Sequence, residues 1–270
     1  MLLCTLGDVV LDVVVRLERA LVPGDDVFAR TTLGAGGQAA NVAAWAVALG
    51  ARARYVGRRG DDLSGRLLEA ELAERGVEIA GPAGGRTGVV VSLIGADHDR
   101  SMASDRGSAP DLGAADLDES AFRGCEWLHL SGYMLARRPG ADAAAAAAGL
   151  ARTGGARISV DLSSSTLIDA VGPDLFRSRV ERLEPDLVFA TENEAQALAG
   201  TPAAVTVVKR GAAGCTVVRE GEPEHFPALP AQPVDATGAG DAFAAGYLIG
   251  GPRLALEAGT RCVSKIGAMP

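Results

Sequence analysis

Short apolar runs and longer amphipathic or alanine-rich segments alternate along most of this 270-residue chain. The short runs are typical of buried strands, and we place strands at 2–7, 126–131, 156–162, 186–190, 204–208 and 214–218, with another ending at Val56. The longer segments predict helices at 38–49, 61–75, 140–153, 173–183, 192–199, 238–249 and 252–266. Strands that alternate with helices favour a doubly wound, mostly parallel sheet, so the expected fold class is α/β.

Two strand-rich segments, about 9–33 and 86–104, depart from this pattern because no helix follows either of them. The second is expected to form a hairpin around residues 97–99. We expect both segments to be antiparallel and to pair as a small β lid on a single domain that spans 1–270. A small isolated sheet exposes an apolar face unless another surface covers it, so the lid also predicts a homodimer.

The run from Asp235 to Asp241, Asp-Ala-Thr-Gly-Ala-Gly-Asp, passes from a loop of small residues into a helix. Gly238 and Gly240 allow a sharp turn and leave no side chain over the backbone amides. The first turn of a helix has unpaired N–H groups and the positive end of the helix dipole, so residues 238–241 predict an anion site suited to phosphate. A carboxylate beside it, Asp241, suits a base that takes a proton from an attacking hydroxyl. The run therefore predicts phosphoryl transfer to an alcohol.

Composition excludes several other classes of protein. The net charge of −8 argues against a nucleic-acid partner, because general nucleic-acid binders are basic. The start of the chain has no basic segment typical of a signal peptide, and no apolar run of membrane-spanning length lacks charges, so we expect a cytoplasmic protein without a membrane partner. The four cysteines are scattered and predict neither a metal site nor a redox pair. The chain also lacks the P-loop motif and the Gly-x-Gly-x-x-Gly of nicotinamide oxidoreductases after its first strand.

The run that ends at Asp241 resembles the C-terminal signature of the ribokinase-like (PfkB) family of carbohydrate kinases. The earlier run from Gly36 to Ala43, Gly-Gly-Gln-Ala-Ala-Asn-Val-Ala, resembles the N-terminal signature of the same family. The resemblance implies a ribokinase-like fold and ATP- and Mg²⁺-dependent phosphorylation of a hydroxymethyl group on a neutral sugar or small polyol. By this resemblance Asp241 is the catalytic base, and Gly238, Ala239 and Gly240 form the anion hole. Sugar binding is then assigned to Asp12, Gly36, Gly37 and Asn41.

The nucleotide side of the resemblance is less regular. Glu194 matches a family glutamate that contacts Mg²⁺ through water, whereas Thr191 replaces the usual asparagine. The strand-turn segment with Lys209, Gly211 and Gly214 resembles the one that approaches the nucleotide. Asp235 and Thr237 lie where the family has a monovalent-cation site, which suggests K⁺ as a further cofactor. Arg106 could contact the substrate or lie in a solvated turn, and the turn is the preferred interpretation. Ser163 is given no role.

Ligands in open α/β sheets bind beyond the carboxyl ends of the strands, which predicts that Asp12, Gly36, Gly37, Asn41, Asp161, Lys209 and Asp241 gather at one edge. The substrate itself stays open. Ribokinase is disfavoured by Val10 and Gln38, and Gln38 also replaces the lysine of phosphosugar kinases in this family. A nucleoside kinase of the same family and a non-catalytic sugar or nucleoside sensor are the alternatives. The sensor is supported by Thr191 and by the missing Asn and Arg after Asp161.

Overall fold

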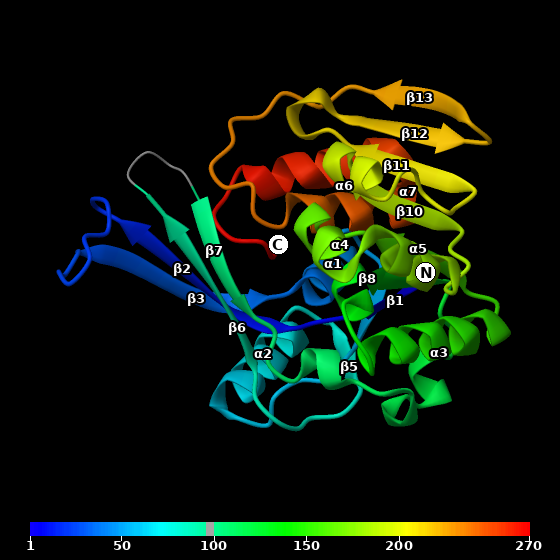
Figure 1. The fold of residues 1–270 in the computed structure, drawn as a ribbon, viewed down its shortest axis with the longest axis horizontal. Helices are drawn as coiled ribbons and strands as arrows, with labels where there is room; N and C mark the ends of the chain where they lie inside the picture. Colours follow the sequence, from blue (N-terminus) through cyan, green and yellow to red (C-terminus); the bar gives the residue numbers. More distant parts are fainter. Residues whose placement is uncertain (96–99) are drawn as a thin grey trace.

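A computed structural model describes residues 1–95 and 100–270. Its main sheet has nine strands in the order β13-β12-β11-β10-β9-β8-β1-β4-β5 (Figure 1). From β11 to β5 neighbouring strands are parallel, and only the β11–β12 and β12–β13 pairs are antiparallel. The strands are β1 Leu2–Leu6, β4 Arg52–Val56, β5 Glu78–Ala80, β8 Trp127–Ser131, β9 Arg157–Asp161, β10 Leu187–Thr191, β11 Val205–Lys209, β12 Cys215–Arg219 and β13 Glu222–Phe226. The predicted mostly parallel α/β sheet is confirmed.

Helices cover both faces of this sheet, and each face has its own apolar core (Figure 1). Strand periodicity sends alternate side chains to opposite faces, so Leu3 joins one core while Leu2, Cys4 and Leu6 join the other. The first core is packed by α1 Gln38–Ala48, α2 Leu63–Glu74 and α7 Ala239–Val263. The second is packed by α3 Gly140–Thr153, α4 Ser165–Val171, α5 Pro173–Glu181 and α6 Glu192–Ala197.

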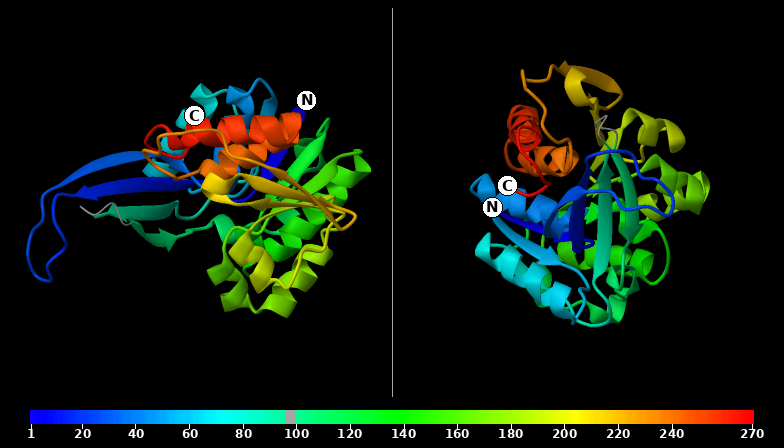
Figure 2. Two further views of the ribbon diagram at one scale, coloured as in Figure 1. Left: turned by 90° about the horizontal axis from the view of Figure 1, so that it is seen from above. Right: turned by 90° about the vertical axis from the view of Figure 1, so that its left-hand side faces the viewer.

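The lid is a separate four-stranded sheet in the order β3-β2-β6-β7, and it projects from the body of the molecule (Figure 2). Its strands are β2 Val10–Leu17, β3 Ala29–Gly36, β6 Gly88–Ile94 and β7 Arg100–Asp105. The expectation of a fully antiparallel lid is wrong, because β2 and β6 pair in parallel. Both strands leave the body in the same direction, and only their partners β3 and β7 return antiparallel. The tip predicted at residues 97–99 lies outside the described residues.

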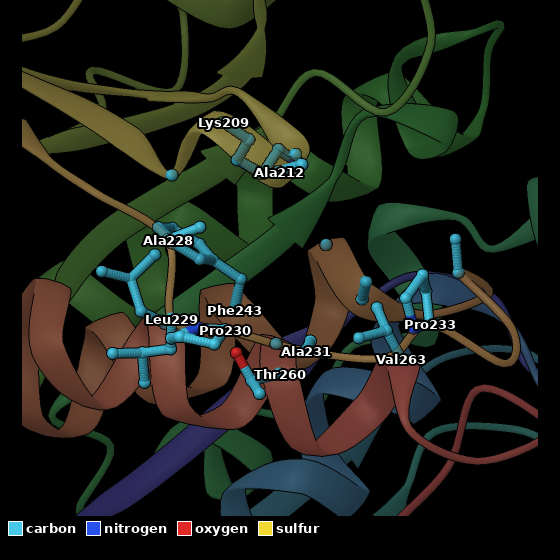
Figure 3. Close-up of a pocket in the computed structure, with 17 residues that line it drawn as sticks. Lys209, Ala212, Ala228, Leu229, Pro230, Ala231, Pro233, Phe243, Thr260 and Val263 are labelled. Atoms are coloured by element: carbon cyan, nitrogen blue, oxygen red, sulfur yellow. The ribbon is translucent and has the colours of Figure 1, made fainter.

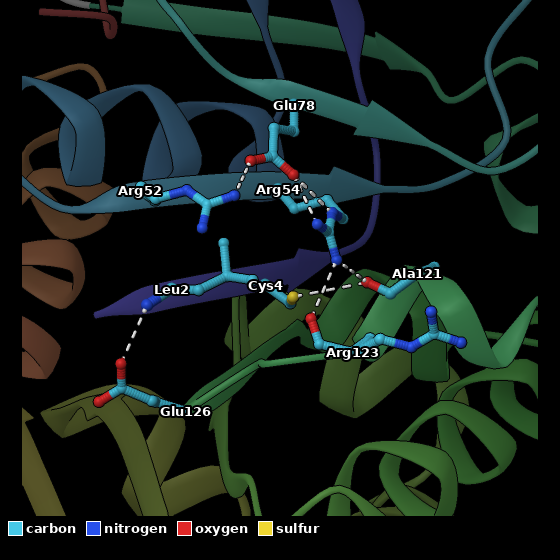
Figure 4. Close-up of polar contacts among 8 residues, drawn as sticks. All are labelled: Leu2, Cys4, Arg52, Arg54, Glu78, Ala121, Arg123 and Glu126. Atoms are coloured by element: carbon cyan, nitrogen blue, oxygen red, sulfur yellow. Dashed lines mark hydrogen bonds and ion pairs between the residues drawn. The ribbon is translucent and has the colours of Figure 1, made fainter.

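Some elements were not predicted from the sequence, namely β5, β13, α4 and several short 3₁₀ helices. β5 has only three residues, and Glu78 ties it to the sheet by ion pairs with Arg52 and Arg54 of β4 at 2.5 and 2.6 Å (Figure 4). The two predicted final helices are continuous except for a break at Gly250 and Gly251, where the backbone is not helical. No helix among residues 1–95 and 100–270 has the length and apolar character needed to span a bilayer.

Candidate active site

Polar side chains gather where neighbouring strands of the main sheet end, as the α/β rule predicts. Asp8 follows β1, Tyr133 follows β8, and Asp161 and Lys209 are the last residues of β9 and β11. The first turn of α7 and the start of α1 lie at the same edge, since Asn41 of α1 contacts Asp241 of α7 across 200 residues of sequence. The predicted gathering of Asn41, Asp161, Lys209 and Asp241 is therefore seen in the structure.

Two cavities meet at this edge, and the first turn of α7 lies between them. The smaller cavity, about 250 Å³, is lined by Thr237, Gly238 and Asp241 from this turn and by residues of α1 and the lid. The larger, about 590 Å³, is lined by Ala239 and Gly240 from the same turn and by the segment after β11 (Figure 3). Successive residues of one helical turn thus face different cavities, which we call the acceptor cavity and the nucleotide cavity after the roles that the sequence leads us to expect.

The backbone of this turn depends on Gly238, the residue that precedes α7. Its φ of 74° lies in the left-handed region, and a Cβ there would lie 2.5 Å from the Cβ of Ala268. Within the described part of the chain, the N–H groups of Gly240 and Asp241 have no hydrogen-bond partner. Ala239 N–H instead donates to the carbonyl of Ala236 at 3.3 Å. Two free amides at a helix start provide donors for an anion.

Asp241 projects from this turn into the acceptor cavity, where Nδ2 of Asn41 donates to its Oδ2 at 2.7 Å. Burial raises the pKa of Asp241 to about 7, and the negative charges of Asp161 and Asp8 act in the same direction. The hydrogen bond from Asn41 and the charge of Lys209 oppose this rise. A carboxyl with a pKa near 7 can act as a general base near neutral pH.

The lid and α1 supply the remaining predicted acceptor residues. Asp12 of β2 lines the acceptor cavity and lies against Gly36, where an added Cβ would be 2.1 Å from its Oδ2. Gly37 has a φ of 100°, and an added Cβ would lie 2.6 Å from the carbonyl oxygen of Asp8. Among the described side chains, Asn41 Oδ1 and Asp8 Oδ1 are buried acceptors without a hydrogen-bond partner. Unpaired buried acceptors are costly and fit a ligand that donates hydroxyl hydrogens.

Arg106 is part of this cavity, so its interpretation as a solvated turn is wrong. Its side chain is 22% exposed, forms an ion pair with the buried carboxylate of Asp8, and lines the acceptor cavity. The guanidinium carbon also lies 3.6 Å from the centre of the Tyr133 ring. Sequence reasoning missed Asp8 and Tyr133 as well, although both follow strands of the main sheet, and that position was a usable signal.

Gln38 and Ser163, which differ from the residues expected from the family resemblance, contact each other in the acceptor cavity. Ser163 Oγ donates to Gln38 Oε1 at 2.6 Å, and both residues line the cavity. Ser163 has a φ of 70°, which is unusual for a residue other than glycine and is common at functional sites. Its N–H donates to Oδ1 of Asp161 at 2.9 Å. Ser163, which had no predicted role, therefore connects the cavity wall to the end of β9.

The nucleotide cavity contains only part of the predicted nucleotide set. Lys209, Gly211 and Gly214 line it, and its other walls are mostly apolar. A Cβ on Gly214 would lie 2.1 Å from the carbonyl oxygen of Phe226, so this turn requires glycine. Thr191 and Glu194 do not line it. They form a capping box at the start of α6, in which the N–H of Thr191 donates to the Glu194 carboxylate at 2.7 Å and the N–H of Glu194 to the Thr191 hydroxyl at 3.3 Å.

Glu194 is nevertheless electrostatically coupled to this edge of the sheet. Burial raises its pKa, the negative charge of Asp161 raises it further, and Lys209 lowers it.

Asp235, the first residue of the C-terminal signature, accepts hydrogen bonds from the N–H and hydroxyl of Thr237 at 2.9 and 2.5 Å and from the N–H of Gly267 at 3.0 Å. Among residues 1–95 and 100–270, no cluster of three or more His, Cys, Asp or Glu side chains could hold a metal ion.

The sequence of this chain matches a known protein family. The model of the pfkB family of carbohydrate kinases matches residues 2–253. The chain belongs to this family. It is therefore a phosphotransferase that acts on an alcohol group of a sugar-type acceptor, and the identification of the family from its two signatures is confirmed.

Curated relatives and solved structures cover most of the chain. A fructokinase from Escherichia coli is 29% identical in an alignment of 270 positions, which covers 91% of this chain and 82% of the relative. An ATP-dependent ribose-1-phosphate kinase from Halopiger xanaduensis is 29% identical, with 90% and 82% covered. The structure of an adenosine kinase from Sinorhizobium meliloti has a TM-score of 0.88 at 25% identity and covers 99% of this chain and 95% of its own. The fold is also that of a putative ribokinase II from E. coli solved with ATP and Mg²⁺, with a TM-score of 0.80, 23% identity, and 99% and 94% covered.

Proposed function

We propose that this kinase transfers the γ-phosphoryl group of Mg·ATP to a hydroxymethyl group of a neutral sugar or related small polyol. The observation that carries the proposal is the placement of one helical turn between two cavities. Asp241 faces the acceptor cavity, while Gly240 faces the nucleotide cavity. A hydroxyl beside Asp241 would lose its proton to the carboxylate and attack a phosphoryl group held at the free amides of Gly240 and Asp241.

The acceptor side supports a sugar. Asn41 and Asp12 would accept hydrogen bonds from neighbouring hydroxyls, as carboxylate and amide oxygens do in polyol sites, with Gly36 and Gly37 giving close backbone approach. Among the described lining residues Tyr133 is the aromatic one, and Arg106 covers a face of its ring. That face of the ring is therefore closed to a stacked nucleobase, which favours a sugar over a nucleoside. The fructokinases among its relatives agree with this choice.

The nucleotide cavity, about 590 Å³ in volume and lined by Lys209, fits ATP in size and charge. The nucleotide cavity has mostly apolar walls for a base, and Lys209 lies beside the free amides at the start of α7, where the phosphates would bind. Gly211 and Gly214 would let the backbone approach the nucleotide. We assign Glu194 a water-mediated contact to Mg²⁺, most of whose ligands the phosphates would supply. Thr191 would act through the capping box that orients Glu194.

Two further features belong to the proposal. Asp235 and Thr237 would place oxygen atoms around a K⁺ ion next to the anion hole, and activity in K⁺ compared with tetramethylammonium salts tests this. The lid, whose Phe28 and Leu33 are 84% and 65% exposed, would bury its outer face in a homodimer.

A coupled assay of ADP release tests the proposed function on a panel of neutral sugars, sugar acids and nucleosides. We expect turnover of at least one neutral sugar. The Asp241→Asn variant keeps the shape of the side chain but cannot take the proton, so kcat should fall by about 10²–10⁴-fold while ATP affinity changes little. A nucleoside as the best substrate would select the nucleoside-kinase alternative. Binding of sugars without ADP release from any of them would select the sensor.

A further inference from the structure

Lys209 is held in one position at the boundary of the nucleotide cavity (Figure 3). Its Nζ lies 2.5 Å from Oδ2 of Asp161, and the two side chains are 15% and 2% exposed. The other oxygen of Asp161 accepts the N–H of Ser163. Asp161 is therefore anchored at both oxygens and fixes the ammonium group of Lys209.

The ammonium group also lies against the first turn of α7. A Cβ added to Gly240 would be 3.4 Å from Lys209 Nζ, so the glycine leaves room for the lysine. An ammonium has three N–H donors, and among the described residues Asp161 is the acceptor that it contacts. Its remaining donors and the free amides of Gly240 and Asp241 are thus close together at the same helix start.

Lys209 is charged in this setting. Burial alone would lower its pKa, but Asp161, Glu194 and Asp241 outweigh burial and raise the pKa of the ammonium above its usual value. Burying a salt bridge removes two charges from water and often adds little to stability. A fixed cation that is only 15% exposed and that faces a cavity next to an anion hole points instead to an anionic ligand.

We propose that Lys209 is a catalytic residue whose ammonium contacts the phosphoryl group during transfer, and that Asp161 positions it. This inference rests on the proposed function. The acceptor hydroxyl gives its proton to Asp241, its oxygen forms a bond to the γ-phosphorus, and the bond from that phosphorus to the β,γ-bridging oxygen breaks to release ADP. Lys209 stays protonated throughout and neutralises charge on the oxygens of the transferred group.

Binding measurements separate this role from a purely structural one. Lys209→Met removes the charge while keeping an unbranched side chain of similar length. By titration calorimetry in Mg²⁺, we expect its affinity for β,γ-methylene-ATP to fall at least about tenfold more than its affinity for ADP, because only the former carries the γ-group. Equal losses for both nucleotides, or no loss for either, would overturn the inference.

A second variant covers the case in which Lys209→Met folds poorly, since it leaves the buried Asp161 without its partner. The double variant Asp161→Asn/Lys209→Met replaces the ion pair by two neutral side chains, so its thermal midpoint should recover. We expect kcat to remain about 10²–10³-fold below wild type, as for the loss of one group that stabilises the transition state. Recovery of kcat to within tenfold of wild type would show that the pair serves only to join β9 and β11.

The neighbouring Arg210 provides a matched control. It is a basic residue in the same segment, is paired with Glu192 at 3.2 Å, and does not line the nucleotide cavity. Arg210→Met should leave both nucleotide affinities and kcat within about twofold of wild type. If this variant too lost more affinity for β,γ-methylene-ATP than for ADP, a specific role for Lys209 would be contradicted. If the wild type phosphorylates no sugar, the proposed function fails, yet the comparison of the two nucleotides still decides the role of Lys209.

Discussion

Replacing Asp241 by Asn is expected to stabilise the protein while it removes activity. Burial raises the pKa of Asp241 from 3.8 to about 7. The ionised carboxylate is therefore less favourable in the folded protein than in the unfolded chain. An asparagine has no charge to bury, and its side-chain oxygen can still accept the hydrogen bond from Nδ2 of Asn41.

The size and the pH window of this effect follow from the same shift. The difference of about three pKa units corresponds to roughly 4 kcal/mol at about 1.4 kcal/mol per unit. Between pH 3.8 and about 7 the unfolded chain has lost the proton that the folded protein keeps. The free energy of unfolding of the wild type therefore falls as the pH rises through this window, and the full penalty is present above pH 7.

Thermal unfolding of the wild type and Asp241→Asn at pH 5 and pH 8 measures this difference. We expect the variant to be more stable at pH 8, by up to about 4 kcal/mol, with a clearly smaller advantage at pH 5. Asp169→Asn on the exposed face of α4 is a matched control and should change stability little at either pH. A variant that is no more stable than the wild type at pH 8, or an advantage independent of pH, would refute the reasoning.

Three further predictions concern catalysis, specificity and assembly. The kcat/KM of the wild type should fall about tenfold per unit as the pH drops below about 7, because Asp241 is then protonated; a flat profile down to pH 5.5 would contradict its role as base. Neutral sugars should be preferred over phosphosugars by at least about tenfold in kcat/KM, or roughly 1.4 kcal/mol. The reason is that Arg106, a cation of the acceptor cavity, is already paired with Asp8 and is not available to a substrate phosphate. Better turnover of fructose 1- or 6-phosphate than of any neutral sugar would count against this. Light scattering at high micromolar concentration should show a dimer of the wild type. Leu33→Asp, which places a charge on the exposed face of the lid, should dissociate it. A fully active monomeric wild type would exclude assembly through the lid.

Local sequence patterns were sufficient for most elements and for part of the site. Periodic apolar positions report directly which face of a strand or helix is buried, so the alternation of strands and helices was predictable. The two glycine-rich signatures were also readable, because a positive φ at Gly37 and Gly238 excludes most other residues. The short β5 and the exposed β13 were missed, since three residues, or a strand with mostly exposed side chains, carry little periodicity.

Pairings between distant segments could not be read in this way. The parallel pairing of β2 with β6 depends on the direction in which both strands leave the body of the molecule. The sequence pattern of either strand alone does not indicate this direction. The same holds for Arg106, whose place in the site is set by Asp8, 98 residues earlier in the chain.

The sequence by itself determined the α/β fold class, the family and the identity of Asp241 as the candidate base, because each of these depends on local periodicity or on a contiguous motif. Only the tertiary structure decided that one turn of α7 separates two cavities, that Asn41 contacts Asp241, and that Asp161 fixes Lys209 beside Gly240. The physical reason is that these contacts arise where strand ends from distant parts of the chain meet at one edge of the sheet. Their distances and the resulting pKa shifts depend on packing in three dimensions, which a linear pattern of residues does not specify.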